Sequence, residues 1–124
     1  MRINIKATSL ELTTAISNYA EKKVSALEKF INKNDESAVA NVEVGKSTKH
    51  HHSGDIFRAE INLHIAGKDL RAVAEKDNLY SAIDEVKDEM VREITSHKAR
   101  LRTLLRRGGA KIKDFIRGFY RENF

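Results

Sequence analysis

The sequence predicts an α+β domain of order β-α-β-β-β-α, a four-stranded sheet with two helices packed on one face. Residues 57–65 alternate between apolar and polar side chains, which is typical of a half-buried strand. Residues 77–107 carry apolar side chains three and four positions apart, which is typical of a long amphipathic helix. The 124 residues include no proline and no cysteine, so neither a proline kink nor a disulfide is expected, and one core must hold the domain together.

The first strand and the first helix lie near the amino terminus. Alternating apolar and polar residues predict a short strand over residues 2–6. A helix is expected from Thr13 to about Ile31, because the apolar period is regular only after Thr13, whose hydroxyl can cap the first turn. A capping box of Thr8 and Glu11 is the alternative, and it would start the helix earlier. The apolar stripe of this helix consists of Ile16, Ala20, Val24, Leu27 and Ile31.

Three further strands are predicted over residues 38–44, 57–65 and 70–74, with a tight turn at 66–69 in which Gly67 takes a positive φ. The strand–helix–strand connection should be right-handed, which makes the first two strands parallel if they are adjacent. The sheet face without helices should be solvated. Its polar residues are Arg58, Glu60, Asn62, His64 and Arg71.

The second helix is long, with Asp77 as its expected N-cap. Its buried stripe is predicted to consist of Leu79, Ile83, Val86, Met90, Ile94, His97, Leu101 and Leu104. The end of the helix is strongly basic. It carries Lys98, Arg100, Arg102, Arg106 and Arg107.

Two segments are expected to lie outside the core. Residues 45–55, which include His50–His52, have glycine at both ends and no apolar anchor, and therefore predict a mobile loop. Residues 108–124 form a basic, amphipathic tail that follows the domain of residues 1–107. The tail is too short to be stable alone as a helix, so it packs on the domain or orders on a partner.

The net charge of +5 is unevenly distributed. Residues 1–95 hold 14 Lys and Arg against 16 Asp and Glu, whereas residues 96–124 hold nine against two. Such a basic block attracts polyanions, although a merely solvated tail is the alternative. No apolar run is long enough for a membrane span, and no signal-peptide pattern opens the chain, so a cytoplasmic protein is expected.

The sequence offers little for catalysis or metal binding. The adjacent side chains of His50–His52 point in different directions and lack matching ligands, so a solvated loop, or contact with phosphate when protonated, is favoured over a metal site. His64 lacks a cleft, and His97 falls on the buried stripe. We therefore expect no enzyme, no cofactor, no metal and no small-molecule substrate.

The basic residues of the two helices are the best candidates for a binding surface. Cations spaced about one helical turn apart suit the closely spaced phosphates of folded RNA, and few aromatic side chains are available for stacking. This predicts binding directed by shape and phosphate rather than by base sequence. The candidate RNA-binding residues are Lys22, Lys23, Lys29, Lys33, Lys87, Arg92, Lys98, Arg100, Arg102, Arg106 and Arg107.

Several segments, taken in order, resemble one family, that of the ribosome hibernation promoting factors and ribosome-associated inhibitors, in its short form. The resemblance covers about residues 2–107. It rests on Glu11-Leu12-Thr13, Leu27-Glu28-Lys29-Phe30, Phe57-Arg58-Ala59-Glu60-Ile61 and Leu79-Tyr80-Ser81-Ala82-Ile83-Asp84, followed by Asp88, Arg92, Ile94, His97-Lys98 and Arg100-Leu101.

The resemblance implies a domain that binds the small ribosomal subunit and its 16S rRNA in the mRNA channel, across the A and P sites. Such a factor would exclude mRNA and tRNA and inhibit translation under stress. The resemblance also implies that the long form's separate carboxy-terminal dimerisation domain is absent. The basic residues that fit the family by position are Lys23, Lys29, Arg92, Lys98 and Arg100.

The chain also departs from the family pattern. Glu89, Thr95 and Ser96 stand where the family is usually basic, and Asn78 stands where it usually has aspartate. Two other functions stay open at this point. One is a general double-stranded RNA-binding protein, and the other is a protein-interaction module that docks through its tail.

Overall fold

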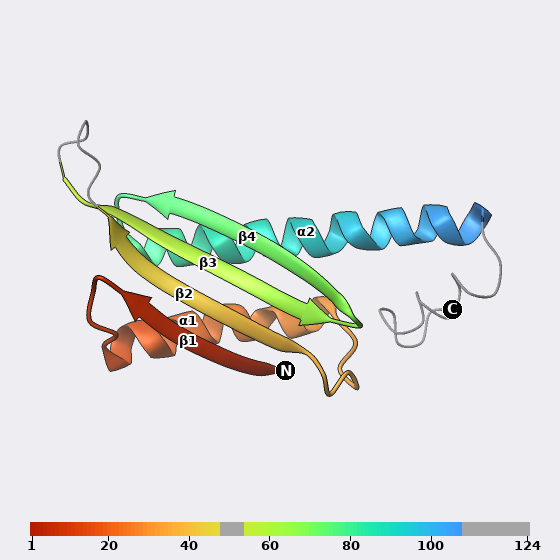
Figure 1. Cartoon of the computed structure of the whole chain (residues 1–124), viewed down its shortest axis with the longest axis horizontal. Helices are drawn as coiled ribbons and strands as arrows, with labels where there is room; N and C mark the ends of the chain where they lie inside the picture. Colours follow the sequence, from red (N-terminus) through yellow and green to blue (C-terminus); the bar gives the residue numbers. More distant parts are fainter. Residues whose placement is uncertain (48–53, 108–124) are drawn as a thin grey trace.

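The computed structural model describes residues 1–47 and 54–107 and has the predicted order of elements. Four strands form one sheet in the order β1-β2-β3-β4, and both helices lie on one of its faces (Figure 1). This confirms the predicted fold class. The elements are β1 (Arg2–Thr8), α1 (Thr14–Ser25), the 3-10 helix η1 (Ala26–Phe30), β2 (Val39–Ser47), β3 (Ile56–Ile65), β4 (Lys68–Lys76) and α2 (Leu79–Arg107).

The sheet is mixed. β1 and β2 pair in parallel, as predicted for a crossover through α1, whereas β2, β3 and β4 form an antiparallel meander. In one row across the sheet, Ile5, Val42, Ile61 and Ala72 are neighbours and face the helices. One continuous core therefore lies between the sheet and the helical layer.

The two helices divide the sheet between them. α1 packs on β1, and α2 packs on β3 and β4. The core is built from small and branched side chains, and its largest fully buried members are Val24, Leu27, Val44, Ile61, Leu63, Ile83, Val86, Met90 and Ile94.

The helix ends agree with the sequence at one terminus and differ at two others. The Thr13 hydroxyl accepts a hydrogen bond from the Ile16 N–H at 3.2 Å, so the predicted N-cap of α1 is confirmed. The α-helix ends at Ser25, whose hydroxyl donates to the Lys22 carbonyl, and the chain continues as 3-10 helix to Phe30. The prediction of one α-helix to Ile31 was therefore wrong over its last turns.

The N-cap of α2 is Asn78 rather than Asp77. The Asn78 side-chain oxygen accepts from the Ser81 N–H at 3.1 Å, and the Asn78 carbonyl accepts from the Ala82 N–H. An asparagine caps a helix about as well as an aspartate, so the start of the helix is preserved.

The strands are longer than predicted. Residues 45–47 continue β2 instead of beginning a loop, because Gly45, Lys46 and Ser47 pair with Arg58, Phe57 and Ile56 of β3. The apolar alternation that predicts a strand stops at residue 44, but the hydrogen bonds between strands involve only the backbone and continue past it. Gly67 has the predicted positive φ, 73°.

α2 extends past the end of the sheet (Figure 1). A helix of 29 residues is about 43 Å long, whereas a strand of ten residues spans about 33 Å. Leu101 is the last buried residue of the stripe, and Leu104 is 45% exposed, so the prediction that Leu104 is buried was wrong. The expectations for His50–His52 and for residues 108–124 fall outside the described residues.

Candidate nucleic-acid interface

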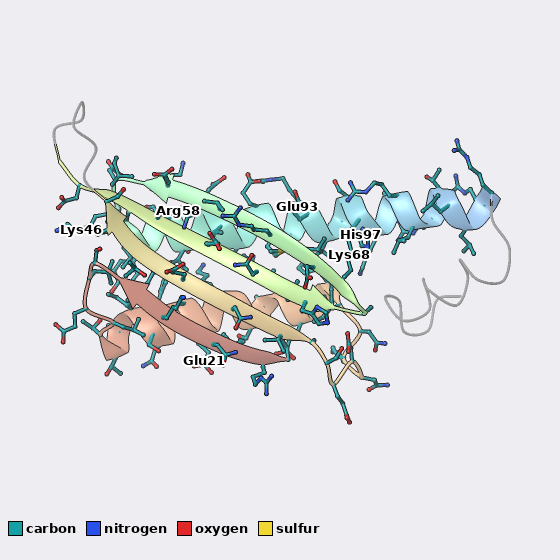
Figure 2. All side chains as sticks on the ribbon, in the orientation of Figure 1. Glu21, Lys46, Arg58, Lys68, Glu93 and His97 are labelled. Carbon is teal, nitrogen blue, oxygen red and sulfur yellow. The ribbon has the colours of Figure 1, made fainter. Side chains whose placement is uncertain are left out.

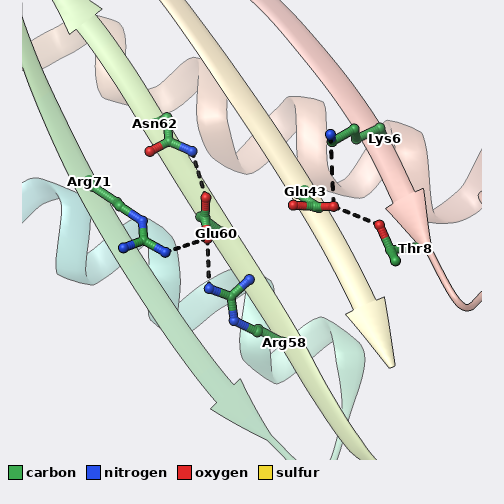
Figure 3. A network of polar contacts seen from close by, with 7 residues as sticks. All are labelled: Lys6, Thr8, Glu43, Arg58, Glu60, Asn62 and Arg71. Carbon is green, nitrogen blue, oxygen red and sulfur yellow. Dashed lines mark hydrogen bonds and ion pairs between the residues drawn. The ribbon is translucent and has the colours of Figure 1, made fainter. Parts of the chain in front are cut away.

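Three cations on the uncovered sheet face, called here the open face, are paired with acids (Figure 3). Both Arg58 and Arg71 donate to Glu60 Oε1, at 2.6 and 2.9 Å. Lys6 lies 3.9 Å from Glu43, which also accepts from the Thr8 hydroxyl. The open face is therefore close to electrically neutral and offers little attraction to phosphate.

Glu60 is the centre of this network. Its side chain is only 13% exposed, and Asn62 donates to its second oxygen at 2.7 Å. The hydrogen bonds from Arg71, Asn62 and Arg58 lower the pKa of Glu60 to about 2, although burial acts in the opposite direction. As predicted, the open face is not covered by helices, but the neighbours of Glu60 shield its carboxylate from solvent.

On the outer surface of α1, η1 and α2, called here the helical face, polar contacts connect the two helices. The Tyr19 hydroxyl donates to Asp84 Oδ1 at 2.6 Å, and Lys23 Nζ lies 3.4 Å from the same oxygen. The Tyr19 and Tyr80 rings meet edge to face at 4.8 Å. The Lys23–Asp84 contact lies four residues further along both helices than the Tyr19–Tyr80 contact. The two helices therefore run side by side in the same direction.

The lysines of the amino-terminal half have different surroundings. Lys22, Lys29 and Lys33 are exposed. Within residues 1–47 and 54–107, no ion pair engages these three. Lys23 is instead half-buried between the helices, with its ammonium 5.6 Å from the centre of the Tyr19 ring.

Two candidates on α2 are bound to acids of their own helix. Arg92 donates to Glu85 at 3.2 Å and also to Glu89, and the contact with Glu89 raises the pKa of Arg92. Lys87 Nζ lies 3.6 Å from Asp88. A phosphate can therefore bind Arg92 only by replacing Glu85 or Glu89 as its partner.

Toward the end of α2 the acids disappear. Lys98 is half-buried, and burial lowers the pKa of its ammonium, with Arg102 adding repulsion. At 100° per residue, Arg102 and Arg106 lie on one flank of the helix, whereas Arg100 and Arg107 lie on the opposite flank. All four arginines are exposed, so cations surround this end of α2 rather than forming one stripe.

His97 marks the place where α2 passes the β3–β4 turn, beside Lys68 (Figure 2). Its side chain is buried, as predicted from the apolar stripe. Burial lowers the pKa of His97, and the positive charges of Lys68 and Arg100 add to that effect while Glu93 opposes it. A neutral imidazole at pH 7 does not contribute to the positive charge of the surface.

The described residues contain no group of three or more His, Cys, Asp or Glu side chains that could hold a metal ion. Over the same residues, no helix combines the length and apolarity needed to cross a bilayer.

Residues 3–102 match the family described as Sigma 54 modulation protein / S30EA ribosomal protein. The chain belongs to this family. The S30EA match includes helix α1, helix α2 as far as residue 102, all four strands except for Arg2, and the interhelical contact of Tyr19 with Asp84.

Two characterised relatives of this S30EA chain have related names. "Ribosome hibernation promoting factor" of Klebsiella oxytoca is 31% identical over 102 residues, which are 82% of this chain and 98% of the relative. "Ribosome hibernation promotion factor" of Staphylococcus aureus is 31% identical over 101 residues, which are 82% of this chain but 50% of the relative. The chain therefore spans about half the length of the second relative.

Two solved structures share the fold. The Protein Y N-terminal domain of Thermus thermophilus has 30% identity and a TM-score of 0.65, covering 78% of this chain and 99% of that domain. A ribosomal subunit interface protein from Coxiella burnetii has a TM-score of 0.60, covering 80% and 99%, but only 18% identity, so it supports the fold alone.

Sequence reasoning missed two of the acids that pair with the candidate cations, Asp84 and Glu85. Asp84 was quoted only as part of a motif, yet it joins Lys23 and Tyr19 across the two helices. Glu85 accepts a hydrogen bond from Arg92, seven residues further along α2, and sequence reasoning did not identify this contact. In a helix, seven residues are nearly two full turns, so this spacing could have indicated the contact.

Proposed function

We propose that the chain is a ribosome hibernation factor that binds the small ribosomal subunit and its 16S rRNA through the helical face. Family membership and the names of two relatives support this assignment. In this proposal the domain occupies the mRNA channel across the A and P sites. It prevents mRNA and tRNA from binding, inhibits translation under stress, and acts in the cytoplasm.

The observation that carries the proposal is the difference between the two faces. On the open face, Arg58, Arg71 and Lys6 are neutralised by Glu60 and Glu43. On the helical face, a set of exposed cations has no acid partner within the described part of the chain. That set is Lys22, Lys29, Lys33, Arg100, Arg106 and Arg107.

The mechanism requires no covalent step. Cations at the surface replace counterions around the RNA phosphates, and the released ions provide much of the binding free energy. The sheet and its core keep the two helices at a fixed separation, so the cations form a pattern that suits one folded RNA surface. Inhibition follows because the domain and the natural ligands of the channel cannot occupy the same space.

Binding also has local costs. Release of Arg92 from Glu85 and Glu89 costs little, because ion pairs between exposed side chains are weak. Arg92 and Lys23 therefore remain RNA-binding candidates alongside Lys22, Lys29, Lys33, Lys87, Lys98, Arg100, Arg102, Arg106 and Arg107.

Co-sedimentation of the protein with small subunits tests the proposal. The wild-type protein should sediment with the subunits at low salt and be released at high salt, and it should inhibit translation of a reporter mRNA in vitro. Replacing Arg100, Arg102, Arg106 and Arg107 by Ala should weaken binding and make it less dependent on salt. Absence of binding at low salt would contradict the proposal.

An arbitrary RNA duplex is the appropriate competitor, because a general double-stranded RNA-binding protein would also show salt-dependent binding. A hibernation factor should be displaced from the subunits only by a large excess of duplex. Equal affinity for the duplex and the subunits would favour the general RNA-binding function instead.

A further inference from the structure

Tyr80 is exposed in an unusual setting. Among the described residues it is the only exposed aromatic side chain, with 40% of its surface accessible. It lies in the first turn of α2, with its ring edge to face against Tyr19 of α1 at 4.8 Å. This contact holds the Tyr80 ring against the neighbouring helix while leaving part of it open to solvent.

Polar groups of opposite charge lie beside this ring. One turn further along α2, Asp84 accepts from Tyr19 and pairs with Lys23. Both contacts go to Asp84 Oδ1, so Oδ2 can accept a further hydrogen bond. Lys23 and the exposed Lys22 bring positive charge to the same end of the helical face.

This combination fits one kind of ligand. An aromatic ring stacks on a nucleobase, a carboxylate oxygen accepts from an exocyclic amino group, and a lysine pairs with the phosphate that follows. A phosphate without a base cannot stack on the Tyr80 ring and would be repelled by Asp84. A protonated amine would suit Asp84 but would be repelled by Lys22 and Lys23.

We infer that Tyr80, Asp84 and Lys23 form a site for one unpaired nucleobase that carries an exocyclic amino group. The inference rests on the proposed RNA-binding function and adds a base contact to the phosphate contacts. The base stacks on Tyr80, its amino group donates to Asp84 Oδ2, and Lys23 pairs with the adjacent phosphate. The Tyr19 hydroxyl keeps Asp84 in position through its hydrogen bond.

The first test compares two ligands of equal backbone charge on the full chain at low salt. The probes are a short oligoadenylate and an abasic ribose-phosphate oligomer of the same length, followed by fluorescence anisotropy of a terminal dye. Stacking of one base predicts about fivefold or more tighter binding of the oligoadenylate. Equal affinities, or no binding of the oligoadenylate, would overturn the site, whereas absence of co-sedimentation with small subunits at low salt would contradict the proposed function itself.

Substitutions at Tyr80 provide the second test. Tyr80→Phe keeps the ring and should keep the preference for oligoadenylate over the abasic oligomer. Tyr80→Leu keeps an apolar, helix-forming side chain and should remove most of the preference. The Arg100→Ala/Arg106→Ala variant should weaken both ligands equally and leave their ratio unchanged. A preference that survives in Tyr80→Leu would overturn the role of the ring.

The third test addresses Asp84 with the wild-type protein. Oligoadenylate and an oligomer of purine riboside stack similarly, but only adenine carries the exocyclic amino group. A hydrogen bond to a carboxylate predicts about threefold or more tighter binding of the oligoadenylate. Equal binding of the two oligomers would remove Asp84 from the site.

Discussion

At the scale of single residues, Glu60 shows how three neighbours change the chemistry of one carboxyl group. Arg71, Asn62 and Arg58 hold its pKa at about 2, whereas the carboxyl of an unfolded chain has a pKa near 4.5. A pKa that is lower in the folded state stabilises the fold at pH values above the unfolded value. That contribution is lost as the pH falls from about 4.5 toward 2.

We therefore predict that Glu60→Gln lowers the free energy of unfolding at pH 7 and that this loss disappears on acidification. The shift corresponds to at most about 3.5 kcal/mol, on the order of 1.4 kcal/mol for each pKa unit. Urea unfolding of both proteins from pH 7 to pH 2 measures the difference. Glu43→Gln is the matched control, since Glu43 lies on the same face with a 31% exposed side chain. Parallel stability profiles for the wild type and Glu60→Gln would contradict the assignment.

At the scale of elements, the periodicity of apolar residues correctly predicted which face of a helix or strand is buried. The stripe of α2 from Leu79 to Leu101 is buried as expected, and so are Ile61 and Leu63 in β3. The apolar period of a helix does not indicate where the sheet beneath that helix ends. Leu104 continues the pattern of Leu101, yet the sheet has already ended there.

The same limit applies to the candidate site. The sequence identified the basic residues because charge is a property of each side chain. It did not identify Asp84 as the partner of Lys23, since that contact depends on how α1 and α2 are placed on the sheet. Nor did it indicate that Glu85 and Glu89 both bind Arg92.

Leu101 and Leu104 provide a matched pair for measuring where the core ends. Leu101 is 3% exposed, so Leu101→Ala should lower the free energy of unfolding by about 2–4 kcal/mol through lost burial and a residual cavity. Leu104 is 45% exposed, so Leu104→Ala should change stability by less than about 0.5 kcal/mol. Both values come from denaturant unfolding. Similar losses for the two variants would show that the helix end packs against something in the free protein.

At the scale of the whole molecule, the arrangement of charge matters more than its total. The net charge is +5, but the open face pairs Lys6, Arg58 and Arg71 with acids, whereas α2 ends in a cationic turn without acids. A polyanion should therefore bind the molecule in one orientation. This separates a specific interface from general attraction between a basic protein and RNA.

Two variants of equal net charge test that orientation. Arg100→Ala/Arg106→Ala removes two cations from the helical face, and Arg2→Ala/Lys6→Ala removes two from the open face. If the helical face meets the phosphates, the first variant should reduce the slope of log affinity against log salt by about 1.4–1.8, because two phosphate contacts are lost. The second variant should keep the wild-type slope, and small-subunit binding titrations at several salt concentrations measure both. Equal reductions in the two variants would mean that only the total charge matters, and a reduction confined to the open-face variant would place the RNA on the sheet.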